Sequence, residues 1–204
     1  MTWCGTHNLA PPCAGKRDIP CAAVFLAGAP LHKPLLLQPC QHPRQARQTA
    51  TVTGDVVVLA VPYPALKEIA AQYGDQLAGK IVVDITNPLN FETFDSLVVP
   101  ADGSAAAELA AALPSSHVLK SFNTTFAGTL ASATVGPNQT TVLIAGDDAA
   151  AKETLAAAIT AGGLGAIDAG SLSHARELEA MGFLQLTLAA GEKIQWTSGF
   201  GIVR

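Results

Sequence analysis

The stretch DVVVLAVPYPALKEIAAQYGDQLAGKIVVDITNP, residues 55–88, decides the fold class of this chain. It opens with an unbroken run of mostly β-branched apolar residues at 55–61, which predicts a strand covered on both faces. Apolar side chains then recur at helical spacing through 66–77, and Gly79 ends that helix. A second apolar run at 80–86 predicts the next buried strand. Strand, helix and strand in this order predict a parallel α/β unit.

The alternation continues to the end of the chain. Further strands are expected at 117–122, 140–146 and 165–168, with a final one at 196–203. Helices are expected at 104–113, from the capping residue Asp147 to Gly162, and from Ser173 to about Ala190, while 91–103 looks like an irregular loop. We therefore predict an α/β fold, a Rossmann-like doubly wound parallel sheet with helices on both faces.

The bulk composition bounds the class of protein. The chain has 204 residues, of which 49% are hydrophobic and 14% charged, enough for one domain with a real core. No apolar run reaches the roughly 20 residues of a membrane span. The formal net charge is −4, whereas a nucleic-acid binder is expected to be basic. We expect a cytoplasmic protein with a small-molecule partner, and neither nucleic acid nor membrane as a partner.

Residues 1–50 differ from the remainder. They hold all four cysteines, seven of the 13 prolines, and five basic residues against one acidic residue. Residues 51–204 hold no cysteine, and seven basic residues against 15 acidic ones. This contrast predicts an atypical segment at 1–50, containing a degenerate first strand and loop, followed by a Rossmann-like domain at 51–204.

Three functional interpretations of the first segment are weak. A secretory signal would need an earlier apolar stretch, and Asp18 and Pro20 interrupt the one present. Zinc modules usually pair their ligands as C-x2-C or H-x3-H, and only Cys4-x2-His7 and Cys40-x-His42 come near this pattern, so free thiols and no metal are favoured. The acidic, cysteine-free remainder argues against a disulfide framework.

A fourth interpretation is that the segment is a misread N-terminus, a high-GC coding region read out of frame, because it is rich in proline, arginine, glutamine and cysteine. The run AAVFLAG at 22–28 resists this idea. It looks like a buried strand leading into a turn at Gly28.

Neutral polar residues follow three of the expected strands. They are Val61-Pro62-Tyr63, Thr86-Asn87-Pro88 and Phe122-Asn123-Thr124. Ligands of open parallel sheets bind beyond the carboxyl ends of the strands. Such groups suit a nicotinamide ring, a ribose and a second redox ring, since hydride transfer needs two positioned rings rather than a nucleophile. Ordinary turn chemistry is the alternative explanation.

Hydrolytic chemistry has little support. The sequence contains neither a G-x-S-x-G elbow nor an H-E-x-x-H pair. His117 and His174 lie at the starts of elements, where exposure is expected. Asp84 lies inside a strand, where a hydrogen-bonded structural role and a functional one are equally consistent with the sequence. We therefore name no catalytic side chain.

The last expected helix is apolar nearly all round between Ala180 and Ala190. A surface helix needs only one apolar stripe. Either a second subunit covers it, giving a homodimer, or it is a central core helix.

Five runs follow one another in the sequence: DVVVLAVPY, GKIVVDITNP, SFNT, GDD-x3-K and IDAGSL-x3-R-x-L-E. From about Asp55 to Val203, this ordered set resembles the NADPH-dependent coenzyme F420 reductase-like family. The resemblance implies a Rossmann domain, bound NADP, a homodimer, and hydride transfer to coenzyme F420 or a flavin. It implies that Val61, Pro62 and Tyr63 lie beside the nicotinamide and its ribose. Asn87 and Pro88 would follow near the paired rings, and Asn123 and Thr124 would hold the nicotinamide or the deazaflavin.

One departure from the family is serious. The family opens with a strand and a G-x-G-x-x-G loop, whose glycines let the backbone approach the pyrophosphate. Here Gly28 is the one glycine that remains as a cofactor-binding candidate, and Pro30 lacks an N–H for phosphate. The alternatives are therefore an inactive relative that keeps only the fold and dimer interface, and a non-redox small-molecule binding module.

Overall fold

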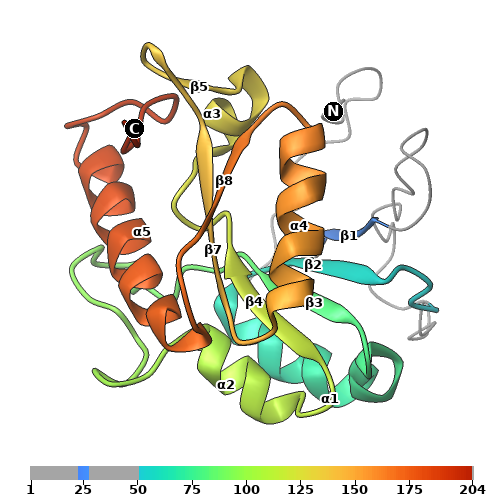
Figure 1. Cartoon of the computed structure of the whole chain (residues 1–204). Helices are drawn as coiled ribbons and strands as arrows, with labels where there is room; N and C mark the ends of the chain where they lie inside the picture. Colours follow the sequence, from blue (N-terminus) through green and yellow to red (C-terminus); the bar gives the residue numbers. More distant parts are fainter. Residues whose placement is uncertain (1–22, 28–50, 204) are drawn as a thin grey trace, which may run out of the picture.

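The computed structural model describes residues 23–27 and 51–203. A six-stranded sheet in the order β1-β2-β3-β4-β7-β8 forms its centre (Figure 1). The strands are β1 (Ala23–Ala27), β2 (Val56–Ala60), β3 (Ile81–Asp84), β4 (His117–Ser121), β7 (Thr141–Gly146) and β8 (Gly165–Asp168). The helices are α1 (Leu66–Leu77), α2 (Ala105–Ala112), α3 (Ala127–Ser132), α4 (Ala149–Ala161) and α5 (Ala175–Ala190). The short strands β5 (Thr134–Val135) and β6 (Asn138–Gln139) form a separate hairpin.

The predicted α/β fold is confirmed. Strands β2, β3 and β4 are parallel neighbours, as are β7 and β8. Side chains alternate between two apolar cores, as the pleat of a strand requires. Val57 and Val82 pack with α1 and α2, whereas Val83 and Leu119 pack with α4. Figure 1 shows α4 crossing one face of the sheet, with α1 and α2 together at the other side.

The sheet is mainly parallel, and it departs from the expected parallel order at two places. Strand β7 runs antiparallel to β4. The connection between these strands, residues 122–140, holds the six-residue α3 and the β5–β6 hairpin. Strand β1 is antiparallel to β2, and its last residue, Ala27, pairs with Val56 at the beginning of β2. Strand β1 therefore ends at the edge opposite the carboxyl ends of β2 and β3.

Three local expectations need correction. Residues 196–203 form no strand, because turns at 191–192 and 196–197 lead the chain back along α5, where the Phe200 amide donates to Gln185. Asp148, not Asp147, caps α4 by accepting from the Ala151 amide, while Asp147 accepts from the Leu172 amide. A 3-10 turn at Leu172–His174 precedes α5.

Candidate functional site

A cleft of about 540 Å³ opens at the carboxyl ends of β2 and β3. It is lined by Ala60, Val61, Pro62, Tyr63, Ile85, Thr86, Asn87, Phe91 and Leu186. Its walls are mostly apolar with a few polar groups, the usual composition of a small-molecule site. The cleft lies at the strand ends where the sequence predicted a ligand, and Val61, Pro62, Tyr63 and Asn87 all reach it.

Asn123 lies next to the cleft rather than in its lining. Its side-chain Nδ2 donates to Oδ1 of Asn87 at 3.0 Å and to the Leu178 carbonyl at 2.7 Å. In return, Nδ2 of Asn87 donates to the Asn123 carbonyl at 3.0 Å. The ends of β3 and β4 are thus tied together and to α5 by neutral hydrogen bonds.

Gly182 of α5 lies directly over this pair of asparagines. A Cβ atom at this position would lie 2.2 Å from Oδ1 of Asn87 and 2.9 Å from Nδ2 of Asn123. Both approaches are well inside van der Waals contact, so a larger residue would force α5 or the asparagines to move. The glycine therefore lets α5 cover the strand ends closely.

Two buried polar atoms at this edge have no hydrogen-bond partner among the described residues: Oγ1 of Thr86 and Oδ1 of Asn123. Buried polar atoms in native proteins are nearly always satisfied. A hydroxyl can donate and accept, whereas the amide oxygen accepts only. The two atoms together could satisfy a ligand that carries an N–H donor, such as a carboxamide or a ring amide.

Tyr63 contributes its ring to the cleft and turns its hydroxyl toward α2. The hydroxyl donates to Glu108 at 2.7 Å. Burial, and then the hydrogen bond to the negative Glu108, raise the pKa of Tyr63 to about 12. The phenol is therefore neutral at physiological pH.

The loop after β3 presents Phe91 at the cleft with 59% of its surface exposed. The loop is ordered by its own hydrogen bonds: Oδ1 of Asn90 accepts from the Glu92 amide at 2.9 Å, and Pro88 accepts from the Val98 amide at 2.7 Å. Phe91 also meets Phe94 edge to face, with ring centroids 5.7 Å apart. The region predicted as irregular from residue 91 thus holds an aromatic ring in place.

Beneath the cleft, Lys120 lies between two carboxylates. Its Nζ is 2.9 Å from Oδ2 of Asp84 and 2.9 Å from Oε1 of Glu179. All three residues are fully buried. Burial raises the pKa of Glu179 against the opposing influence of Lys120. Asp84, singled out in the sequence, therefore takes part in a buried ionic cluster.

The remaining predicted positions are less directly involved. Pro88 is buried and begins the ordered loop, and Thr124 is buried in the turn next to Asn123. Neither contributes to the cleft lining. Gly28 lies outside the described residues. In 51–203, no group of three or more histidine, cysteine, aspartate or glutamate side chains could bind a metal. No helix in this part of the chain combines the length and apolarity needed to cross a membrane.

Sequence reasoning noted Thr86 at its strand end without assigning it to the cofactor. It missed Phe91 and Leu186 as cleft residues, and Lys120 and Glu179 as partners of Asp84. A signal existed for the last two. A lysine in the apolar run 117–122 and a glutamate at a core-facing position of a helix are both exceptions to the pattern around them.

Comparison with known proteins agrees with this architecture. Residues 36–88 match the family model described as NADP oxidoreductase, coenzyme F420-dependent. An F420-dependent NADP reductase of Methanocaldococcus jannaschii is 34% identical over 136 residues, which is 65% of this chain and 60% of that protein. The crystal structure of a protein assigned as an F420-dependent NADP reductase, from Arthrobacter sp. FB24, superposes with a TM-score of 0.67 at 27% identity, covering 74% of this chain and 70% of that one. Over about two thirds of its length, the chain is thus similar to coenzyme F420-dependent NADP oxidoreductases.

Two further proteins are similar to this chain. The metalloreductase STEAP3 of Rattus norvegicus is 36% identical over 138 residues, 66% of this chain and 26% of that protein. The hypothetical protein SMa0349 of Sinorhizobium meliloti has a TM-score of 0.54 at 30% identity, with 59% of this chain and 58% of that one covered. The chain thus spans about a quarter of the first curated relative and 60% of the second.

Proposed function

We propose that this protein is an NADP(H)-dependent oxidoreductase that transfers hydride between NADPH and a deazaflavin or flavin-type acceptor in the strand-end cleft. The observation that carries the proposal is the cleft itself, at the carboxyl ends of β2 and β3 and flanked by the mutually bonded Asn87 and Asn123. The similarity to NADP oxidoreductases supports a nicotinamide cofactor.

The residues present fit the ring end of such a cofactor. The cleft volume of about 540 Å³ is ample for planar rings. The two unpartnered oxygens, of Thr86 and Asn123, fit a ring system that carries amide groups. In this proposal Val61, Pro62 and Tyr63 hold the nicotinamide and its ribose, Asn87 and Pro88 lie near the paired rings, and Asn123 and Thr124 hold the nicotinamide or the deazaflavin.

These residues position the reacting rings and exclude water from the cleft. A bound nicotinamide would supply the hydride itself, so the protein need not provide a nucleophile. The apolar walls from Val61, Ile85 and Leu186 keep water from the reacting carbon. Tyr63 stays neutral, so it places no charge at the ring.

A specific observation favours a second candidate, a non-redox binding module that uses the same cleft without NADP. The sequence has no G-x-G-x-x-G loop, and β1 ends at the edge of the sheet opposite the cleft. A strand that leads into a phosphate loop should end at the same edge as the ligand. Under this candidate Gly28, proposed as a phosphate-loop glycine, contributes nothing to binding, and the chain is an inactive relative of the redox enzymes.

The experiment is a spectrophotometric assay of the full chain with NADPH and oxidised coenzyme F420, following NADPH consumption under anaerobic conditions. We expect turnover in the wild type and a turnover rate at least about tenfold lower in Asn87→Ala. The exposed control Thr154→Ala on α4 should turn over at the wild-type rate. Coenzyme F420 binding without any turnover would support the second candidate instead.

We also propose that the protein is a homodimer assembled through α5. Leu184 on this helix is 51% exposed, and Trp196 in the segment that follows is 53% exposed, which is unusual for large apolar side chains close together in sequence. Sedimentation equilibrium on wild type and Leu184→Glu tests this: a dimer that the substitution dissociates is expected, and a monomeric wild type contradicts it.

A further inference from the structure

Three charged side chains from different elements meet in the interior beneath the cleft. Asp84 ends β3, Lys120 lies beside it on β4, and Glu179 comes from α5. Their exposed fractions are all 0%. Hydride transfer as proposed gives none of them a chemical task.

The cluster holds one basic group and two acidic ones. One ammonium faces two carboxylates, with Nζ of Lys120 2.9 Å from an oxygen of each. Part of the excess is met by α2, whose first amides, of Ala105 and Ala106, donate to Glu179 at 3.0 Å and 3.3 Å. The positive end of a helix favours such a carboxylate. Buried ion pairs often stabilise a protein no better than apolar side chains of similar size, so stability alone is a weak reason for this cluster.

The cluster also holds one residue of the cleft by its backbone. Oδ1 of Asp84 accepts from the Thr86 amide at 2.8 Å. Nζ of Lys120 donates to the Thr86 carbonyl at 2.6 Å. Both backbone polar groups of Thr86 are therefore fixed by charged partners, and charge-assisted hydrogen bonds are the stronger kind.

Thr86 links the buried cluster to the cleft. It lines the cleft, its hydroxyl is one of the two unpartnered buried oxygens, and the next residue is Asn87. Any movement of the Thr86 peptide would move the Thr86 side chain and the neighbouring Asn87, two of the residues that line the cleft. Because Lys120 is also bound to Glu179 of α5, the same ammonium joins the cleft floor to the helix that covers Asn87 and Asn123.

We propose that Lys120 is a positioning residue, whose ammonium, held by Asp84 and Glu179, fixes the Thr86 peptide and so sets the geometry of the cleft for its ligand. The part of the proposal that concerns the ligand rests on the proposed NADP-dependent function. The part that concerns the Thr86 peptide stands on the ligand-free protein.

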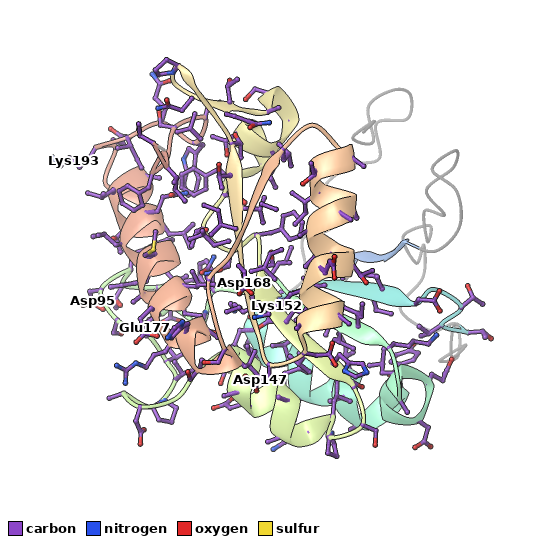
Figure 2. The ribbon with its side chains drawn as sticks, viewed as in Figure 1. Asp95, Asp147, Lys152, Asp168, Glu177 and Lys193 are labelled. Atoms are coloured by element: carbon purple, nitrogen blue, oxygen red, sulfur yellow. The ribbon has the colours of Figure 1, made fainter. Side chains whose placement is uncertain are left out.

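The test compares Lys120→Met with a matched Lys152→Met. Lys152 of α4 also binds a carboxylate, Asp168 at 2.8 Å, and a backbone carbonyl, that of Gly170 at 3.2 Å. It lines no part of the cleft. Figure 2 shows Lys152 and Asp168 near one another beside α4. Amide hydrogen exchange at Thr86 is measured by NMR on the ligand-free full chain, and NADPH affinity by calorimetry.

We expect exchange at Thr86 to be at least about tenfold faster in Lys120→Met and unchanged in Lys152→Met, with NADPH affinity at least about tenfold weaker in the first variant alone. If Lys120→Met does not fold, the double variant Asp84→Asn/Lys120→Met replaces it, since it removes one charge of each sign and leaves Glu179 with the α2 amides. Unchanged exchange at Thr86 in a folded variant overturns the proposal. A wild type that does not bind NADPH refutes the proposed function, and Thr86 exchange then still decides the role of Lys120.

Discussion

Asn87 and Asn123, 36 residues apart in the sequence, hold each other by two hydrogen bonds of 3.0 Å across the ends of β3 and β4. One bond joins the side chains, and the other joins the Asn87 side chain to the Asn123 backbone. The third bond of this group ties Asn123 to the Leu178 carbonyl of α5. The two asparagines therefore act as one unit that links two strands and a helix at the edge of the cleft.

This relationship predicts strong coupling between the two positions. Either alanine variant breaks the one bond between the two side chains, while Asn87 keeps its bond to the Asn123 carbonyl in Asn123→Ala and Asn123 keeps its bond to the Leu178 carbonyl in Asn87→Ala. Because the second substitution cannot break the side-chain bond again, the two effects should not add. In a double-mutant cycle on urea unfolding, we expect an interaction energy of about 0.5–3 kcal/mol. Additive effects of Asn87→Ala and Asn123→Ala would contradict it.

Gly182→Ala should damage the site more than its small size suggests. The added methyl group would lie 2.2 Å from Oδ1 of Asn87, so the helix or the amide pair must shift, at a cost of about 1–3 kcal/mol in stability. Gly74→Ala on α1 is the matched control. There the new methyl group lies 3.6 Å from its nearest neighbour, Leu113, and replacing glycine within a helix should stabilise by up to about 1 kcal/mol. The free energy of unfolding, measured in urea for both variants, decides: equal effects would mean that Gly182 does not set the fit of α5.

The contrast between these two glycines shows what the sequence could and could not predict. The strands at 55–61 and 80–86 and helix α1 followed from local patterns, because apolar runs and helical spacing are properties of neighbouring residues. The edge of the sheet that carries the cleft followed from the parallel order of β2 and β3. The close approach of Gly182 to Asn87 depends on how α5 docks, which no local pattern reports.

The remaining errors have the same origin. The direction of β1 and of β7 depends on which strand edge is available and on the length of the connections, and the expectation of a parallel sheet could not supply either. Lys120 and Glu179 broke the apolar patterns around them, but their meeting required the tertiary fold. The predicted cap of α4 was wrong by one residue because both Asp147 and Asp148 can cap a helix. Asp147 accepts from the Leu172 amide, and Asp148 caps the helix.

Phe91→Ala tests whether the exposed ring takes part in binding. Because the ring is 59% exposed, its removal should change the free energy of unfolding by no more than about 0.5 kcal/mol. Loss of a ring that stacks on a planar ligand should weaken binding of coenzyme F420 by about 1–2 kcal/mol, roughly five- to thirtyfold. Val98→Ala, in the same loop and 50% exposed, is the control for loop perturbation. If both variants bind like wild type in a fluorescence titration, Phe91 is not a wall of the ligand site.

Glu179→Gln should change how stability depends on pH. Burial raises the pKa of Glu179 above its ordinary value of 4.5 despite Lys120, so folding favours the protonated acid. The contribution of this group is therefore fully present below about pH 4.5 and is lost as pH rises through the raised pKa. Glutamine does not titrate, so the stability of wild type relative to the variant should fall as the pH rises above about 4.5.

The control for that experiment is the exposed Glu177→Gln on the same helix, which reports the effect of a surface amide on α5. Urea unfolding at a series of pH values gives the comparison, since Asp84 and Lys120 are retained in both variants. A profile for Glu179→Gln that runs parallel to wild type over the whole range would mean that Glu179 is not the buried acid with the raised pKa.

Calorimetric titration of the full chain with NADPH at neutral pH tests the central claim most directly, since every step of the proposed reaction needs this cofactor in the cleft. The account predicts saturable binding with a Kd on the order of micromolar, about −8 kcal/mol, and at least tenfold weaker binding by Asn87→Ala. No binding to the wild type at about millimolar NADPH would contradict it, and would leave the cleft to a ligand other than a nicotinamide cofactor.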